Sequence, residues 1–341
     1  MVKVAISGSS GNVAQEVYDA LVATGKHEIV LLSRKDVPSE PLPPGVTQVK
    51  ANYEDVDGLV KSLEGVHTVL CFIVSQMDPG NVSQKNLIDA AIKASVKRYA
   101  PSEWATSTFD YLPWYDGKAE IRKYLEEINK DNTVLEYSLF HPGLFTNYFA
   151  APHQTAKHVF AFQLQIDFEN RRAIILEGGE DGVINLLTVQ DFANIVAKAV
   201  GYEGVWPIVG GIKGDEVTVG QLIALGEKIR GNNSRNPQVK PYTVGVATNS
   251  YCYKGGPFAV EKLQADDLKA GVLKSTWIPR LAHPSIPVDQ VDALSQGFIS
   301  GVLLAIESGA YKVNDAWNQL LPDYEITKAE EFLTDIWRGK P

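Results

Sequence analysis

Short apolar runs alternate with amphipathic stretches along the first 140 residues of the chain. The runs are rich in Val, Ile and Leu and predict strands, at residues 2–7, 28–32, 47–49, 68–74, 134–139 and a shorter one near 96–100. Between them apolar residues recur at helical spacing, as Val13, Val17 and Leu21 do, and Gly25 is placed to end that helix. The predicted helices cover residues 12–24, 54–63, 81–95 and 115–130.

Regular alternation of strand and helix requires crossover connections, which place helices on both faces of a parallel sheet. We therefore predict a doubly wound α/β fold, a Rossmann-type dinucleotide-binding domain, for residues 1–150. Beyond residue 150 the alternation is less regular, with helices predicted at 188–200, 218–230, 288–308 and 328–338. We assign residues 151–341 to a smaller mixed α/β region that binds substrate and completes the core, with segments that can return to the Rossmann sheet.

Composition narrows the class of partner. The net charge of -9 and the lack of a long basic cluster argue against nucleic acid or an anionic membrane surface. No apolar run approaches the roughly 18 residues of a membrane span. Cys71 and Cys252 are far apart and are interpreted as reduced thiols. The sequence thus predicts a soluble, cytoplasmic protein whose partner is a small molecule.

In doubly wound folds, ligands bind beyond the carboxyl ends of the strands. The first such segment is Gly8-Ser9-Ser10-Gly11-Asn12-Val13-Ala14, with the spacing G-x-x-G-x-x-A between a predicted strand and a predicted helix. The first glycine permits a tight turn, the second lets backbone N–H groups approach a pyrophosphate, and the small third residue allows close helix packing. We predict dinucleotide contacts from Gly8, Ser10, Gly11, Asn12 and Val13; the alternative is an ordinary turn between strand and helix.

The end of the second strand indicates which dinucleotide is bound. It reads Ser33, Arg34, Lys35, where a site for NAD usually has an acidic residue for the ribose 2′-hydroxyl. A guanidinium can grip the 2′-phosphate of NADP in a bidentate way. We therefore predict NADPH as cofactor, with Arg34 as the main contact and Ser33 and Lys35 beside it. A solvated charged turn, or an NAD site that uses Asp36, is the alternative.

The candidates for chemistry are few. The chain has neither a Gly-x-Ser-x-Gly elbow nor a His-Glu-x-x-His motif, so we expect neither a serine hydrolase nor a metal site. The Tyr-x-x-x-Lys pair of short-chain dehydrogenases is also absent, because Trp114 stands four residues before Lys118. Lys118 follows an aromatic stretch that includes Tyr115, and such surroundings can draw a lysine pKa from about 10.4 towards 7–8. From spacing alone the solvated helix lysine is the favoured interpretation, because most helical lysines are exposed. His141, after a strand, is a candidate for lining the substrate pocket.

Several motifs taken together resemble the NmrA-like family, and within it the isoflavone reductase-like branch of atypical short-chain dehydrogenases. Their order and spacing carry the resemblance, which covers most of the chain. They are the glycine loop, Ser33-Arg34, Lys97-Arg98-Tyr99-Ala100-Pro101-Ser102-Glu103-Trp104, Lys118-Ala119-Glu120-Ile121-Arg122, His141-Pro142-Gly143-Leu144-Phe145, Leu187-Thr188-Val189-Gln190-Asp191-Phe192-Ala193 and Glu203-Gly204-Val205-Trp206-Pro207-Ile208-Val209-Gly210-Gly211.

The resemblance implies an NADPH-dependent reductase of a small, often aromatic or alkaloid-like metabolite, with Lys118 at the position of the family's catalytic lysine. It places Ser75, Ser102 and Trp104 beside the nicotinamide. Phe145 and Tyr148 then border the substrate, together with Trp104, Tyr115 and His141. Asn52 lies in the adenine-contacting segment, where the family frequently has Asp.

Two other functions fit the same motifs. The family contains members that bind the dinucleotide as redox sensors without turning it over, and an isomerase or cyclase could use the pocket for acid–base chemistry with no net redox change. We expect substrate identity to depend on loops within 145–185 and 245–290, where residues 251–258 form either a lid or an irregular surface loop.

The cationic strand end gives a test of the cofactor. Replacing Arg34 with Ala should weaken NADPH binding by roughly 1.5–3 kcal/mol, the value of a charged hydrogen bond, and leave NADH binding almost unchanged. Titration calorimetry with each dinucleotide measures both effects. Equal losses for the two would contradict a 2′-phosphate contact.

Overall fold

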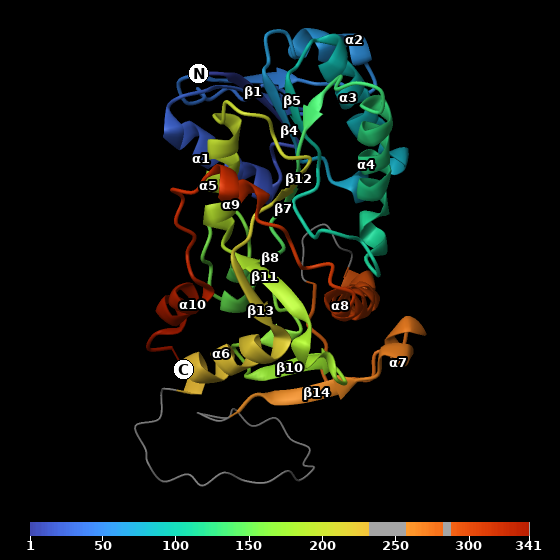
Figure 1. The fold of residues 1–341 in the computed structure, drawn as a ribbon, viewed down its shortest axis with the longest axis vertical. Coiled ribbons are helices and arrows are strands. Elements are labelled where there is room, and N and C mark those ends of the chain that lie inside the picture. Colours follow the sequence, from blue (N-terminus) through green and yellow to red (C-terminus); the bar gives the residue numbers. More distant parts are fainter. Residues whose placement is uncertain (232–256, 282–287, 341) are drawn as a thin grey trace.

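A six-stranded parallel sheet forms one end of the molecule in the computed structural model, which describes residues 1–231, 257–281 and 288–340 (Figure 1). The strand order is β3-β2-β1-β4-β5-β6, and all neighbouring strands are parallel. The strands are β1 (Lys3–Ser7), β2 (Glu28–Ser33), β3 (Val46–Lys50), β4 (Thr68–Cys71), β5 (Arg98–Ala100) and β6 (Glu136–Tyr137). This order and direction confirm the predicted doubly wound α/β fold.

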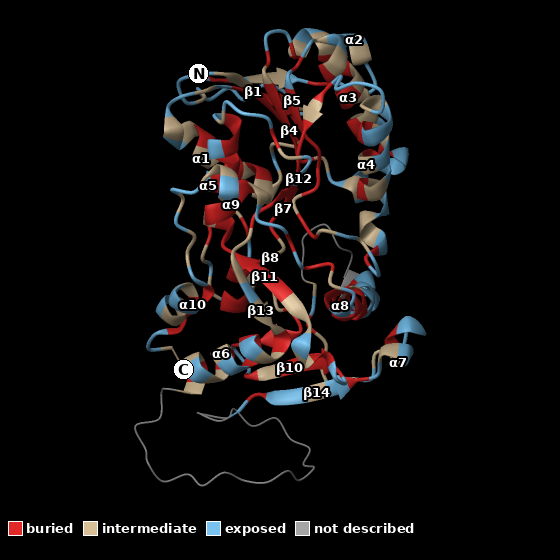
Figure 2. Cartoon of the chain, viewed as in Figure 1, coloured by how far each residue is buried: buried red, intermediate tan, exposed pale blue. Residues whose placement is uncertain are grey.

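Helices cover both faces of this sheet. Successive residues of its central strands point to opposite faces, and the residues on both faces are apolar. Val4 and Ile6 of β1 pack in one core cluster with helices α1 (Asn12–Thr24) and α5 (Val189–Val200). Ala5, between them, packs in a second cluster with α2 (Val56–Ser62), α3 (Val82–Lys93) and α4 (Asp116–Ile128). Figure 2 shows the result, with the sheet strands mostly buried and the outer faces of the helices exposed.

The chain beyond residue 150 returns to this part of the molecule. Helix α5 packs against α1, and β12 (Val209–Gly211) pairs in parallel with β7 (Leu139–His141). The strand predicted at 134–139 is in fact two short strands, because the chain leaves β6 after Tyr137 and enters β7 at Leu139. Segments on both sides of residue 150 therefore share one hydrophobic core.

Two smaller three-stranded sheets and their helices form the opposite end (Figure 1). One sheet has the order β13-β11-β8 and the other β14-β10-β9. Their strands are β8 (Leu144–Phe145), β9 (Ile166–Asp167), β10 (Arg172–Leu176), β11 (Val183–Leu187), β13 (Asp215–Thr218) and β14 (Ala259–Leu263). The helices in this half and its connections are α6 (Val219–Gly231), α7 (Ala265–Lys269), α8 (Val291–Glu307) and α10 (Ala329–Trp337), whereas α9 (Ala316–Leu320) packs against β12 beside the central sheet.

The helix boundaries follow the sequence signals closely. Helix α1 spans the predicted residues 12–24, and Gly25 ends it in the left-handed conformation with φ 61°. The strand predicted at 68–74 ends at Cys71, and the chain then forms a short 3-10 helix, η1 (Ser75–Met77). Most of the segment 251–258, which we expected to form either a lid or an irregular surface loop, lies outside the described residues, as does Cys252. Among the helices that are described, none is long and apolar enough to cross a membrane.

Gly8 fixes how closely the loop after β1 approaches the neighbouring strand. Its φ is +68°, a conformation that side chains with a Cβ rarely adopt. A Cβ at this position would lie 2.5 Å from the carbonyl oxygen of Phe72, just beyond β4. Both the backbone conformation and the available space therefore require glycine.

Alanine substitution of Gly8 and Gly25, the two glycines with positive φ on either side of α1, separates the backbone strain from the steric clash. Gly25 has φ +61°, and no neighbouring atom lies within 4 Å of the point where a Cβ would stand. Gly25→Ala should therefore cost only the left-handed strain, about 1–2 kcal/mol. Gly8→Ala adds a clash with backbone and should cost more than about 3 kcal/mol. Urea unfolding of both variants gives the two free energies of unfolding. Equal losses would show that the contact with Phe72 does not constrain the loop.

Candidate functional site

The predicted cofactor residues lie at one edge of the central sheet. The glycine loop follows β1, Ser33 ends β2, and Ser75 and Ser102 follow β4 and β5. These four strands are neighbours in the order β2-β1-β4-β5 and run in the same direction, so their carboxyl ends meet. Such an edge is where doubly wound folds bind ligands.

The glycine loop leaves the start of α1 open to an anion. The N–H of Gly11 donates to the carbonyl oxygen of Gly8 at 3.0 Å and closes the turn. Gly11 is also the N-cap residue, no side chain caps the helix, and its first turn holds no acidic residue. Ser10 is exposed, Asn12 and Val13 are half-buried, and Ala14 is fully buried beneath the loop. The N–H groups of the first turn are therefore available to a phosphate.

The charged residues that follow β2 differ in whether they already have a partner within the protein. Asp36 is engaged by Lys50, whose ammonium lies 2.6 Å from its carboxylate, so the acidic residue that an NAD site would use is already paired. Arg34 and Lys35 are exposed, and neither forms an ion pair with a residue that the structure describes. The backbone N–H of Lys35 donates to Ser33 Oγ at 3.0 Å. Across the edge, Asn52 is exposed and accepts a hydrogen bond from the N–H of Glu54.

Trp104 stands at the carboxyl end of β4 in an unusual conformation. Its φ is +44°, and its indole N–H donates to the carbonyl oxygen of Cys71 at 2.7 Å. Its ring stacks on Phe72 with 4.4 Å between the centroids. Nearby, the hydroxyl of Ser75 is buried and has no hydrogen-bond partner in the described chain. This edge thus offers a fixed aromatic surface beside a free hydroxyl.

Lys118 lies in the first turn of α4 and is only 9% exposed, so it is not a solvated helix lysine. Its ammonium donates to the carbonyl oxygens of Ser102 and Glu103, the latter at 2.8 Å. The same nitrogen lies 5.0 Å from the ring centroid of Tyr115. Burial lowers the pKa of Lys118 to about 8, although the negative charge of Glu103 opposes that shift.

A buried ionic cluster supports this lysine; its three residues lie in motifs that carry the family resemblance, but no sequence signal showed that they meet. Glu103 is 1% exposed, and its carboxylate accepts hydrogen bonds from the Arg122 guanidinium, the shortest at 2.6 Å. The ring nitrogen Nε2 of His141 lies 3.1 Å from Arg122 and 3.5 Å from Glu103. Burial alone would raise the pKa of Glu103, but the His141 ring and the Arg122 guanidinium outweigh it and hold the pKa below its ordinary value.

An aromatic cavity of about 140 Å³ opens beside Trp104. Four of the residues that we expected at the substrate line it, namely Trp104, Tyr115, Phe145 and Tyr148. The other residues that line it are Ala105, Thr106, Trp114, Gly143, Leu144, Phe162, Leu164, Phe298, Val302 and Tyr311. His141, which we also expected at the substrate, is not among them, because its ring is buried in the cluster with Glu103 and Arg122.

The sequence did not predict one wall of the cavity, which is formed by Phe298, Val302 and Tyr311. Phe298 and Val302 belong to α8, whose apolar pattern predicts a helix that packs in the core. Tyr311 follows that helix and carries no motif. No local signal distinguishes an apolar side chain that lines a cavity from one that fills the core, so these residues could be found only from the fold.

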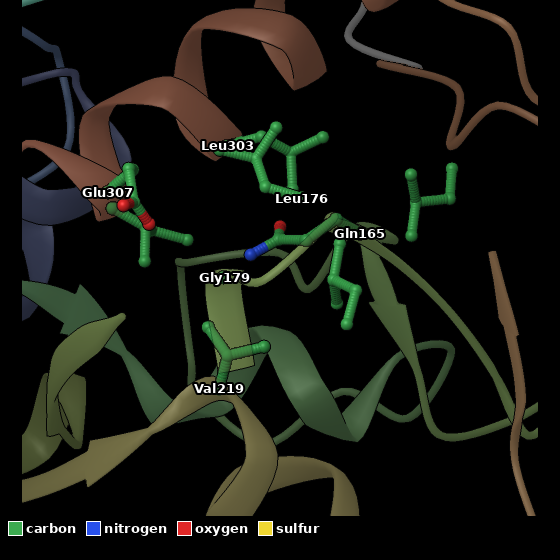
Figure 3. Close-up of a pocket in the computed structure, with 9 residues that line it drawn as sticks. Gln165, Leu176, Gly179, Val219, Leu303 and Glu307 are labelled. Carbon is green, nitrogen blue, oxygen red and sulfur yellow. The ribbon is translucent and has the colours of Figure 1, made fainter. Parts of the chain in front are cut away.

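A second, much smaller cavity of about 10 Å³ lies between β10, α6 and α8, away from the predicted site residues (Figure 3). The side-chain amide of Gln165 lies between Leu303 and Val219, is 1% exposed, and has no partner in the described chain. The remaining lining is mostly aliphatic. In the described residues no cluster of His, Cys, Asp or Glu could hold a metal ion.

Comparison with known proteins shows that this chain is similar to oxidoreductases. The model of the NmrA-like family matches residues 2–244. Oxidoreductase BOA1 of Botryotinia fuckeliana is 27% identical over 287 residues, which cover 81% of this chain and 91% of that protein. The structure of AtPrR2 with NADP+ and (+)pinoresinol matches with a TM-score of 0.65 at 16% identity and covers 98% of both chains. The NADPH-dependent quinone oxidoreductase QOR2 of Escherichia coli, complexed with NADPH, matches with a TM-score of 0.62 at 20% identity and covers 98% of this chain and all of that one.

Proposed function

The chain belongs to the NmrA-like family, and from that premise we propose that it is an NADPH-dependent reductase of a small aromatic or alkaloid-like metabolite. The observation that carries the proposal is the position of the aromatic cavity. Trp104, which lines it, stands at the same sheet edge as the glycine loop and stacks on Phe72, whose carbonyl oxygen limits the space at Gly8. A dinucleotide on that edge and a substrate in that cavity would therefore meet.

The residues at the edge suit NADPH in both charge and space. The open start of α1 would take the pyrophosphate, and Arg34 with Lys35 would take the 2′-phosphate. Ser75 and Ser102 would border the nicotinamide, where the unpartnered Ser75 hydroxyl is free to bind its amide. When bound, NADPH supplies the hydride, and the protein supplies orientation and electrostatics.

The cavity favours an uncharged aromatic substrate. Eight of its lining residues are Trp, Tyr or Phe, and no charged side chain is among the residues that line it in the described chain. Burying a charged group there without a partner would be costly, whereas flat rings gain stacking contacts. Binding of an aromatic ring system also fixes its electrophilic carbon relative to Trp104.

Lys118 is the proposed acid–base or substrate-orienting group. Its bonds to the carbonyl oxygens of Ser102 and Glu103 hold the segment that leads into Trp104. Because its pKa is about 8, the amine loses its proton more readily than a solvated lysine does. The residue can therefore take part in proton transfer at neutral pH as well as hold the backbone in place.

Hydride transfer tests the proposed reaction directly. We expect 4-deuterated NADPH and a panel of conjugated aromatic carbonyl compounds and imines to give a reduced product that carries deuterium, with one NADPH consumed for each product formed. Mass spectrometry of the product locates the label. Turnover at constant NADPH concentration would indicate an isomerase or cyclase instead, and tight binding without turnover would indicate a redox sensor.

The lowered pKa of Lys118 makes the rate depend on pH. If the charged amine is required, kcat/KM should fall as the pH rises through about 8, and Lys118→Met should reduce it by about 100-fold or more at neutral pH. Rate profiles across that pH range measure both effects. Lys123→Met is the matched control, because Lys123 is an exposed lysine of the same helix. A wild-type profile that is flat through pH 8 would exclude the charged amine from the rate.

A further inference from the structure

Three tyrosines from distant parts of the chain meet at the aromatic cavity. Tyr115 ends the 3-10 helix η3 (Pro113–Tyr115), Tyr148 lies in η4 (Thr146–Ala150), and Tyr311 follows α8. All three line the cavity, and they are the only tyrosines among the residues of the described chain that do so. Their phenol groups bring hydroxyls to a space whose other walls are largely hydrocarbon.

The hydroxyls of these tyrosines are not used within the protein. In the part of the chain that the structure describes, neither Tyr148 nor Tyr311 has a hydrogen-bond partner for its hydroxyl, and Tyr311 is only 5% exposed. The polar neighbour of the Tyr115 hydroxyl is the indole of Trp114, which can only donate and leaves the phenol proton free. A hydroxyl that donates to no group of the protein is available to donate to a ligand in the cavity. All three hydroxyls can therefore donate to an oxygen acceptor.

The same surroundings keep these phenols protonated. Burial raises the pKa of all three tyrosines above the ordinary value. Charge on Tyr115 would raise the pKa of Tyr148 further, and charge on either would raise that of Tyr311, which also means that the three groups are close together. At neutral pH each is therefore a neutral O–H donor that holds its own proton.

Lys118 lies outside the cavity and contacts the ring of one of these tyrosines. It is not among the residues that line the cavity, and its ammonium lies 5.0 Å from the ring centroid of Tyr115, which is one of them. A cation over the face of a phenol draws electron density from the ring, so the hydroxyl becomes a stronger donor. The lysine and the tyrosine thus form a pair that does not have the usual Tyr-x-x-x-Lys spacing.

We infer that Tyr115, Tyr148 and Tyr311 form a hydroxyl-donor set that binds a substrate oxygen as it gains negative charge, so that the substrate carries a carbonyl group, alone or conjugated to a C=C bond. The inference rests on the proposed reductase function and deepens it. Addition of a hydride to the electrophilic carbon breaks a π bond and sends its electron pair to the oxygen. The phenols hydrogen-bond to that oxygen without losing their protons, water supplies the proton that completes the product, and NADPH leaves as NADP+.

Kinetics of single Tyr→Phe variants test the donor set. We expect Tyr115→Phe, Tyr148→Phe and Tyr311→Phe each to lower kcat by about 10- to 100-fold on a conjugated carbonyl substrate, with a smaller change in KM, because donors to a developing oxyanion act mainly in the transition state. Tyr99→Phe is the matched control. Tyr99 is fully buried with an unpartnered hydroxyl, but it lies in the core of the central sheet. Unfolding midpoints verify that all four variants fold.

A measurement without NADPH tests the same group independently of turnover. The probe is 4-nitrophenol, whose phenolate is yellow, titrated with pH in the presence of excess protein. Each of the three substitutions should raise the pKa of the bound probe by about one unit, which is a tenfold change in its ionisation, because one donor to the phenolate is lost. Tyr99→Phe should leave it at the wild-type value.

The two experiments separate the inference from the function on which it rests. Deuterium transfer by the wild type, with kcat and probe pKa unchanged in all three variants, would overturn the donor set and leave the reductase intact. A probe pKa that responds to the variants in a protein that transfers no deuterium would support the donor set and overturn the reductase. Failure of 4-nitrophenol to bind the wild-type protein would also count against the donor set.

Discussion

The ammonium of Lys118, buried against two backbone carbonyls, is the contact around which the site is organised. Because it binds the oxygens of Ser102 and Glu103, it joins the start of α4 to the segment that follows β5. That segment carries Trp104 in its left-handed conformation. A charge this deeply buried is tolerated only with close polar partners. The Glu103 carboxylate favours the charged form of Lys118, and its ion pair with Arg122 fixes the same segment from the other side.

The sequence predicted best the features that depend on neighbouring residues. The glycine loop, the limits of α1 and the stop at Gly25 follow from spacing and from backbone conformations that only glycine adopts easily. The cofactor edge was also predictable, because the fold rule sends ligands to the carboxyl ends of the strands. The fold and the family are confirmed, whereas the roles of individual site residues stay predictions.

What the sequence could not reveal depends on contacts between residues far apart in the chain. His141 follows a strand and resembles a pocket residue locally, yet Glu103 and Arg122 draw its ring into a buried cluster. Tyr311 has no motif, and only the packing of α8 brings it to the cavity that Tyr115 and Tyr148 also line. Lys118 could be a solvated lysine by spacing, and its burial becomes evident only when the segment after β5 is placed beside it.

The cavity wall that comes from α8 has a consequence for how such an enzyme diversifies. Phe298 and Val302 pack in core clusters of the smaller sheets, separate from the two clusters that hold the central sheet together. Substitutions there can reshape the space offered to a new acceptor while the redox half keeps its stability. A lineage built on this plan can acquire new substrates through substitutions on the cavity face of α8 alone.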